Sequence, residues 1–371
     1  MKSVIELVDK YISEGIPYID VKVMKDHREL FRYHNGIEKT TGKEKLLMFS
    51  CTKPVTVSVG MKLVELGLMS VDDPVEKYLP AYKDVFVLDE NGKPTAPKTK
   101  MTLRHLFTMS AGITYDKNRY PIDEAIANRP LGTSSTIAAM EAVAKTALIA
   151  DPGKTFTYSL CHDVLAAVIE VAANKKFSEV MKEFILDPLG MNETGFSKNQ
   201  NNDVADIYTV NEENKIVKCD KNNNFVFSPK YESGGAGLIS TVDDYATFAD
   251  MLATEGEGYN GTRVLLEESV KALYEKQLSN LSIESGFTCI QGNDYGYGLG
   301  VRTRVVPTEW GLPVSEFGWD GAAGSYLMAD PVNKVSVVVG MHLRSWPIVF
   351  REKHLEIEKR VYENLKSDGL I

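Results

Sequence analysis

The sequence predicts a mixed α and β fold (α/β, in the α+β arrangement): an antiparallel sheet flanked by N- and C-terminal helices, with an inserted, mostly helical domain. Near the N-terminus, 18–24 and 29–33 alternate between apolar and polar residues across a short turn, which is a hairpin pattern. The middle of the chain has helical patterns and no convincing strand, whereas the C-terminal part returns to strand patterns. Both ends are therefore expected to build one sheet domain, 1–67 with 234–371, around an inserted domain, 68–233.

The individual elements follow from apolar periodicity. Apolar residues at helical spacing near the N-terminus predict an amphipathic helix there, and 351–366 predicts another at the C-terminus. The Asn-rich stretch 199–224 is expected to be a surface loop or hairpin. Further helices are expected at 134–149, 161–174 and 177–187, and strands at 296–302, 314–318, 325–329 and 335–343.

Composition narrows the classes of partner and location. The net charge is −9, and no basic cluster is interleaved with aromatic residues, so nucleic acid is not an expected partner. Charged residues interrupt the first ten positions before the apolar core of a signal peptide could form, and no stretch is apolar for long enough to span a membrane. A cytoplasmic protein that does not bind membranes is expected.

Neither the cysteines nor the histidines have the spacing of a metal site. The cysteines show no C-x-x-C pair, and the histidines show no H-x-x-x-H or mixed Cys/His spacing. We therefore expect no metal and no cofactor. In a cytosolic chain the cysteines are most simply buried thiols; they are Cys51, Cys161, Cys219 and Cys289.

The stretch from Phe49 to Lys53 opens an apolar segment that ends at Gly67 and predicts a helix. Side chains three residues apart on a helix share a face, so Ser50 and Lys53 can meet. A serine hydroxyl is a weak nucleophile until a base takes its proton, and a desolvated lysine is such a base. The helix start also offers unpaired N–H groups to a developing oxyanion. S-x-x-K is common by chance, so its meaning depends on the rest of the chain.

Two later stretches offer partners for this pair. Tyr158 lies just before the helix expected at 161–174. A nearby ammonium and a helix N-terminus can lower the pKa of a tyrosine enough for it to shuttle a proton. The alternative role of Tyr158 is packing. Residues 317–325 are rich in glycine and are expected to form the end of a strand, where the backbone can approach a ligand closely. The alternative there is an ordinary hairpin turn.

Taken together in this order, these features resemble the serine β-lactamase and penicillin-binding-protein superfamily, most closely its class C-like branch and the family VIII carboxylesterases. The stretches 66–80, 102–112, 187–191 and 234–241 are similar to landmarks of the same superfamily, so the resemblance covers nearly the whole chain. It implies a β-lactamase/transpeptidase-like fold. The motif residues that carry it are Ser50, Lys53, Tyr158 and Trp319-Asp320-Gly321.

The resemblance also implies residue roles. Ser50 is the acylated nucleophile, and Lys53 is its proton partner. Tyr158 is the general base that later activates the hydrolytic water. The backbone N–H groups of Ser50 and Ala322 form the oxyanion hole. The implied substrate-binding residues are Leu160, Trp319, Asp320 and Gly321.

Two departures from the β-lactamase pattern bear on the substrate. Leu160 stands where such enzymes carry the Asn of Tyr-x-Asn, and Trp319-Asp320-Gly321 stands where they carry Lys-Thr-Gly. The missing lysine and threonine are groups that would bind a β-lactam carboxylate, and Asp320 would repel that carboxylate if it faced the cleft. Because side chains alternate along a strand, only one of Trp319 and Asp320 can face the cleft. Both departures resemble the esterase branch.

The expected function is therefore a serine hydrolase that acts on small carboxylic esters through a covalent acyl-enzyme. A β-lactamase, or an amidase or peptidase acting on D-amino acids, is the first alternative; Asp320 facing the cleft would favour a substrate with a free amine. The second alternative is a non-catalytic binding protein on the same scaffold. The expected partner is a small ester or amide substrate.

Overall fold

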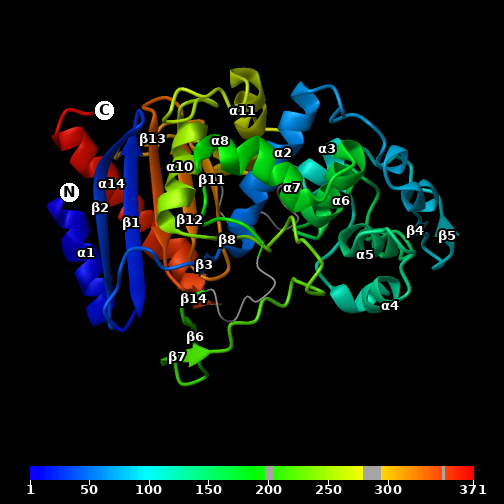
Figure 1. Ribbon diagram of the computed structural model, residues 1–371, viewed down its shortest axis with the longest axis horizontal. Coiled ribbons are helices and arrows are strands. Elements are labelled where there is room, and N and C mark those ends of the chain that lie inside the picture. The colour runs from blue at the N-terminus through cyan, green and yellow to red at the C-terminus, as the bar shows by residue number, and fades with distance from the viewer. Residues whose placement is uncertain (197–203, 279–293, 345–346) are drawn as a thin grey trace.

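An antiparallel sheet built from both ends of the chain forms one half of the structure (Figure 1). The computed structural model describes residues 1–196, 204–278, 294–344 and 347–371. The strands of this sheet are β1 (Tyr18–Lys25), β2 (Arg28–Gly36), β9 (Tyr295–Tyr297), β10 (Arg302–Arg304), β11 (Phe317–Asp320), β12 (Tyr326–Asp330) and β13 (Val335–Gly340). Their order is β2-β1-β13-β12-β11-β10-β9, and every neighbouring pair is antiparallel.

The remaining elements lie around and beyond this sheet. Shorter strands are β3 (Leu46–Leu47), β4 (Val87–Leu88), β5 (Pro94–Thr95), β6 (Ile207–Val210), β7 (Ile216–Cys219), β8 (Ile239–Ser240) and β14 (Leu343–Arg344). The α-helices are α1 (Lys2–Ser13), α2 (Thr52–Glu65), α3 (Leu103–Phe107), α4 (Ile122–Ala127), α5 (Ser135–Val143), α6 (Cys161–Ala173), α7 (Phe177–Met181), α8 (Asp187–Leu189), α10 (Val242–Ala253), α11 (Glu267–Tyr274) and α14 (His354–Ser367). Short 3₁₀ or π turns are η1 (Phe49–Cys51), η2 (Val75–Lys77), η3 (Pro80–Asp84), η4 (Lys117–Arg119), η5 (Lys182–Leu186) and η6 (Val349–Lys353).

The sheet is apolar on both faces, and alternate residues of one strand enter different cores. Val337 and Val339 of β13 pack with α1 and α14, whereas Val338 packs in the core that contains α2 and α10. Figure 1 shows α1 and α14 side by side along the sheet, and α3 to α7 gathered away from its β2 edge. A strand buried on both faces is rich in β-branched residues, as β13 is.

The structure confirms the predicted fold class. Strands from the N-terminal hairpin and from the C-terminal part meet where β1 pairs with β13, in the register Val21 with Val339. The predicted hairpin, the two terminal helices and the helical middle are all present. The middle also contains the small β4–β5 hairpin, which was not predicted, since strands of two residues leave no visible alternation. The strand expected at 296–302 is two strands, β9 and β10, joined at Gly300 (φ +96°).

The structure bears on the expectations about membrane-spanning segments and about the cysteines. No helix there is long and apolar enough to cross a membrane. Cys51 and Cys161 are buried free thiols, and Cys219 is a partly buried one. Cys289 and residues 199–203 of the expected Asn-rich loop lie outside the described residues.

Candidate active site

Ser50 lies in the 3₁₀ turn that leads from β3 into α2, so the predicted helix begins at Thr52 and not at the serine itself. Phe49, directly before it, has φ +45°, a left-handed conformation that is uncommon for an aromatic residue. Such backbone strain often occurs at functional sites, where the surrounding structure holds it. The Phe49 ring is buried in a small core with Ile239 and Ala323, which anchors the turn.

The predicted Ser50–Lys53 pair forms. Lys53 Nζ lies 3.1 Å from Ser50 Oγ and also donates to the Gly235 carbonyl at 2.6 Å. The lysine side chain is fully buried, whereas Ser50 is partly exposed. Burial lowers the pKa of Lys53 from 10.5 to about 7, because removing the ammonium from water outweighs the attraction of Asp163. A substantial fraction of Lys53 is therefore neutral near neutral pH and can accept the serine proton.

The segment 233–236 holds the lysine from the other side, and sequence reasoning missed its role. Gly234 and Gly235 accept hydrogen bonds from Thr56 (2.7 Å) and Lys53. A Cβ atom on Gly235 would lie 2.4 Å from Asp163 Oδ2, so only glycine lets this backbone pass between the lysine and the carboxylate. The glycine run itself is the signal that could have predicted this close approach.

Asp163 is a second residue that sequence reasoning missed. It lies on α6, five residues after Tyr158, and is almost fully buried. Its carboxylate accepts hydrogen bonds from Ser233 (2.6 Å) and Tyr231 (2.8 Å). Burial raises the pKa of Asp163 above its usual value, and these hydrogen bonds and Lys53 oppose the rise. An acidic residue inside an otherwise apolar helix pattern was the available signal.

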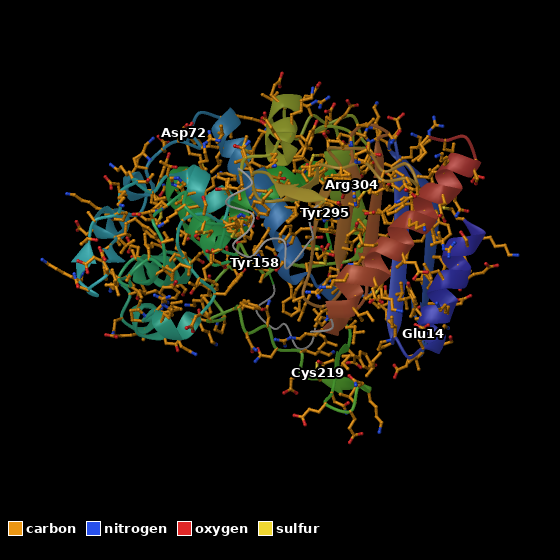
Figure 2. The ribbon with its side chains drawn as sticks, turned by 180° about the vertical axis from the view of Figure 1, so that it is seen from behind. Glu14, Asp72, Tyr158, Cys219, Tyr295 and Arg304 are labelled. Atoms are coloured by element: carbon orange, nitrogen blue, oxygen red, sulfur yellow. The ribbon has the colours of Figure 1, made fainter. Side chains whose placement is uncertain are left out.

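Tyr158 lies between the helical half and the sheet, near the centre of Figure 2. The indole Nε1 of Trp319 donates to its hydroxyl oxygen at 3.0 Å, and this bond and the Ser50 side chain both favour a lower pKa. Burial nevertheless raises the pKa of Tyr158, and Lys53 Nζ lies 4.7 Å from the ring centroid, over the ring face. The expectation that this tyrosine has a low pKa is therefore wrong for the free enzyme. Tyr158 is a neutral phenol there.

Trp319 and Asp320 point to opposite faces of β11, as strand alternation requires. The Trp319 ring lies on the Ser50 side, but it is only 2% exposed and packs against Tyr158 and Tyr297, with 5.5 Å between ring centroids in each case. Asp320 contacts His354 of α14 on the far side, at 2.8 Å. The prediction of Asp320 as a substrate-binding residue is therefore not supported, and Trp319 shapes the site mainly through Tyr158.

Leu160 and Gly321 also differ from their predicted roles. Leu160 is only 1% exposed and packs in the main core, because its side chain turns inward at the start of α6. This burial corrects its prediction as a substrate contact. Gly321 does permit a close approach, but to the chain itself: a Cβ atom there would lie 2.3 Å from the Met48 carbonyl oxygen. The glycine thus lets the turn after β11 rest on the chain segment that carries Ser50.

The two backbone N–H groups expected in an oxyanion hole donate to no partner among the described residues. Within the described residues, neither the Ser50 N–H nor the Ala322 N–H donates a hydrogen bond, and both residues are partly exposed. Ala322 lies in the turn that follows β11, and Ser50 lies in the turn before α2. Unpaired amides that border a nucleophile are suited to a developing negative charge.

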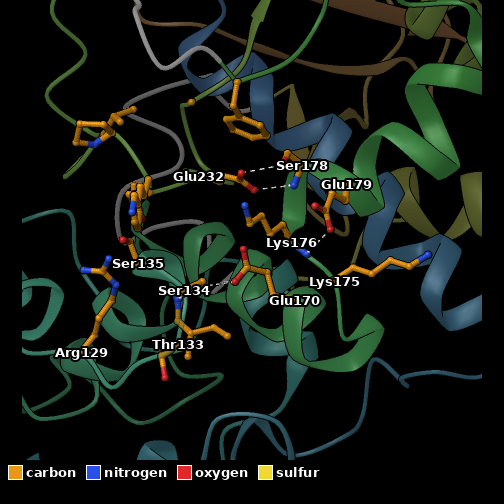
Figure 3. Close-up of a pocket in the computed structure, with 18 of the residues that line it drawn as sticks. Arg129, Thr133, Ser134, Ser135, Glu170, Lys175, Lys176, Ser178, Glu179 and Glu232 are labelled. Carbon is orange, nitrogen blue, oxygen red and sulfur yellow. Dashed lines mark hydrogen bonds between the residues drawn. The ribbon is translucent and has the colours of Figure 1, made fainter.

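A further cavity in the described structure lies away from this group. It has a volume of about 860 Å³ and lies between α6, α7 and the segment 226–237, and its lining does not include the Ser50 group (Figure 3). Its acidic side chains are engaged: Glu232 accepts from the Ser178 N–H and hydroxyl, both at 2.7 Å, and Glu170 accepts from Ser134. The Glu232 contacts anchor the segment that reaches Gly235. No cluster of three or more potential metal ligands occurs among the described side chains.

Comparisons with known proteins identify the family of the chain. The family model described as Beta-lactamase matches residues 4–357. An uncharacterized protein of Mycobacterium tuberculosis, MT1414, is 31% identical over 297 residues, which span 76% of this chain and 73% of that protein. Esterase EstB of Burkholderia gladioli is 26% identical over 316 residues, 78% of this chain and 75% of the esterase.

The fold is also found among solved structures. EstCE1, a hydrolase with promiscuous acyltransferase activity, superimposes with a TM-score of 0.78 at 21% identity, covering 98% of this chain and 97% of that one. With the family model spanning nearly the whole sequence, the chain belongs to the beta-lactamase family, within the serine hydrolase superfamily.

Proposed function

We propose that this protein is a carboxylesterase-like serine hydrolase that cleaves small, uncharged carboxylic esters through a covalent acyl-enzyme on Ser50. The observation that carries the proposal is the Ser50–Lys53 contact of 3.1 Å, with a lysine whose pKa burial lowers to about 7. A neutral amine next to a partly exposed hydroxyl is an activated nucleophile.

In the first half of the reaction, neutral Lys53 takes the proton of Ser50 while Oγ attacks the ester carbonyl carbon. The carbonyl oxygen becomes negative and accepts from the N–H groups of Ser50 and Ala322. When the C–O bond to the alcohol breaks, the alcohol oxygen takes a proton from Lys53, directly or through the Tyr158 hydroxyl. The acyl group remains on Ser50 as an ester.

In the second half of the reaction, water attacks the acyl carbon and gives up a proton to Lys53, directly or through the Tyr158 hydroxyl. The free acid leaves, and Ser50 regains its hydroxyl proton. Tyr158 receives a hydrogen bond from Trp319, which holds its hydroxyl on the Ser50 side of the sheet. Because burial disfavours its phenolate, Tyr158 acts here as a relay for the proton that Lys53 accepts.

The preference for an uncharged substrate follows from the Trp319-Asp320-Gly321 motif. The indole of Trp319 faces the site, where the β-lactamase pattern has a lysine, and Asp320 is turned toward His354. The motif thus supplies neither a cation to hold a β-lactam carboxylate nor an anion to hold a free amine. The orientation of Asp320 removes the argument that favoured D-amino-acid amides.

A panel of three chromogenic substrates tests the proposal. We expect p-nitrophenyl butyrate to be turned over with a kcat/KM at least about 100-fold higher than nitrocefin or D-alanine p-nitroanilide, because about 2.7 kcal/mol of transition-state binding gives this ratio. Intact-mass spectra during turnover should show the butyryl adduct. Faster nitrocefin turnover would establish the β-lactamase alternative, and binding without turnover of any substrate would establish the non-catalytic one.

The pH dependence of the ester reaction reports on Lys53. Since only the neutral amine accepts the serine proton, kcat/KM should fall about tenfold per pH unit well below the pKa of about 7 and level off above it. Product release measured by chromatography avoids the titration of p-nitrophenol itself. Activity that stays constant down to about pH 5 would show that Lys53 is not the base.

A further inference from the structure

We propose that Phe225 is a specificity-determining residue, whose ring borders the Ser50 site and limits the length of the acyl group that the site accepts. Phe225 lies in the loop 220–232, between β7 and the segment 233–236 that holds Lys53. The proposal deepens the function proposed above and rests on Ser50 as the nucleophile. The substrates it names are esters of short-chain acids.

The Phe225 ring contacts both sides of the site. It meets the ring of Tyr115, in the loop between α3 and η4, edge to face with 5.2 Å between centroids. The Tyr115 centroid in turn lies 5.3 Å from the Tyr158 centroid and 5.5 Å from Lys53 Nζ. In the other direction, Phe225 packs against the small core that contains Phe49, the residue directly before the nucleophile. The ring therefore spans the space between the aromatic residues beside the lysine and the turn of the nucleophile.

Hydrogen bonds hold the loop that carries this ring. The side chain of Asn223 is buried; its Nδ2 donates to the Ala236 carbonyl at 2.7 Å, and its Oδ1 accepts from the Phe225 N–H at 3.1 Å. From another direction, Arg344 Nη1 of β14 donates to the Asn222 carbonyl at 2.9 Å. The loop is thus bonded both to the segment behind the lysine and to the sheet half of the molecule. Moving the ring aside would break these bonds.

A cavity lies on the other side of this loop. It has a volume of about 490 Å³ and is lined by residues of 117–123 and 222–227. The lining includes Asn224 and Val226, the two neighbours of Phe225, but not Phe225 itself. The Phe225 ring therefore points away from the cavity and separates it from the nucleophile. Removing the ring opens a path from the site into free volume.

The acyl group is the part of the substrate that the ring limits. In the proposed reaction the alcohol leaves after the first half and needs an open path, whereas the acyl group stays on Ser50 through both halves. A fixed apolar ring beside the turn of Ser50 suits the group that stays. An acyl chain can extend only as far as Phe225, and further methylenes meet a ring that cannot yield without cost.

The acyl-chain profile of the native protein is the first measurement. With p-nitrophenyl esters from acetate to octanoate, we expect kcat/KM to be highest at butyrate or shorter. The octanoate should be at least about tenfold slower than the butyrate, because methylenes without a place in a pocket have effects of this size. A native protein that hydrolyses the octanoate as fast as the butyrate would overturn the proposal.

Substitutions of Phe225 should shift this profile in both directions. For Phe225→Ala we expect the octanoate-to-butyrate ratio of kcat/KM to rise at least about tenfold. Phe225→Trp should lower the butyrate-to-acetate ratio about threefold or more, since the larger ring shortens the space. An unchanged octanoate-to-butyrate ratio in Phe225→Ala would overturn the proposal. A shift seen only among acetates of methanol to octanol would also overturn it, because the ring would then limit the alcohol.

Phe227 provides the matched control. It lies two residues further along the same loop and is also partly buried, but its ring packs against Tyr231 with 4.8 Å between centroids. Phe227 lines the cavity, so Phe227→Ala enlarges that cavity while the Phe225 ring stays in place. It should leave the acyl-chain profile unchanged. Equal shifts in Phe225→Ala and Phe227→Ala would show that a loosened loop, and not the ring, sets the chain length. Phe225→Leu serves as the test if Phe225→Ala does not fold, with a smaller shift of the same sign.

Phosphonate labelling separates this proposal from the proposed function. Ser50 Oγ bonds to the phosphorus of a p-nitrophenyl alkylphosphonate as p-nitrophenolate leaves, so the labelling rate measured by intact mass reports chain access without turnover. We expect an octyl phosphonate to label the native protein at least about tenfold more slowly than a butyl one, and Phe225→Ala to remove most of this difference. Normal ester turnover with equal labelling by both chains would overturn the role of Phe225 alone. No labelling by either would refute Ser50 as the nucleophile, and with it the proposed function.

Discussion

Replacing Ser50 with alanine is expected to lower kcat/KM for p-nitrophenyl butyrate by about 10⁴- to 10⁶-fold, the range seen when a catalytic nucleophile is removed. The reason is that no other described hydroxyl shares both the Lys53 contact and the unpaired N–H groups at the turn. The same variant should lose the adduct that a serine-directed phosphonate leaves on the native protein. Mass spectrometry of the intact chain measures this directly.

Ser159 provides a matched control for this variant. It follows Tyr158 in the sequence but is fully buried, and its hydroxyl hydrogen-bonds to the thiol of Cys161 at 3.0 Å. Ser159→Ala should therefore keep the phosphonate adduct and most of the activity. An adduct that persists in Ser50→Ala, or disappears in Ser159→Ala, would show that the nucleophile has been misassigned.

Replacing Lys53 with methionine is expected to lower kcat by about 10³-fold or more, since Ser50 then loses the one basic side chain that contacts it among the described residues. Methionine keeps the length and apolar stem of lysine, so the change removes the amine with little loss of packing. Lys62→Met on the same helix is the control, because Lys62 is partly exposed and pairs with Glu65. It should leave kcat unchanged. Retained activity in Lys53→Met would require another base for Ser50.

The same substitution should stabilise the protein below about pH 7. The pKa of Lys53 is about 7 in the folded chain and about 10.5 as a free side chain, so the unfolded state binds more protons between these pH values. The native protein therefore gains stability as pH rises from about 7 to 10.5, and a methionine variant lacks this change. Its advantage in unfolding free energy, on the order of 5 kcal/mol near pH 6 from about 1.36 kcal/mol per pKa unit, should shrink toward pH 10. A constant difference across this range would contradict a neutral buried lysine.

The fold could be predicted well because its signals are local. The alternation in β1 and β2, the helical spacing in α1 and α14, and the β-branched run in β13 each reflect the face that a residue buries. The division of 296–302 into β9 and β10 was not predicted, because the sequence does not show whether the glycine at position 300 lies in a strand or in a turn. Short strands such as β4 and β5 depend on their partner and leave no periodic pattern.

The sequence by itself determined the spacing that lets Lys53 reach Ser50, and it determined that Trp319 and Asp320 point to opposite sides of their strand. Both follow from the geometry of the local backbone. Only the tertiary structure decided which of those two side chains faces the nucleophile, because alternation gives relative and not absolute directions. It also decided that Lys53 is fully buried against Gly235, that Tyr158 is a neutral phenol, and that Asp320 contacts His354 on the far side of the sheet. Burial and charge depend on neighbours that lie far away along the chain, so these properties of the site arise only when the two ends of the sequence meet in one sheet.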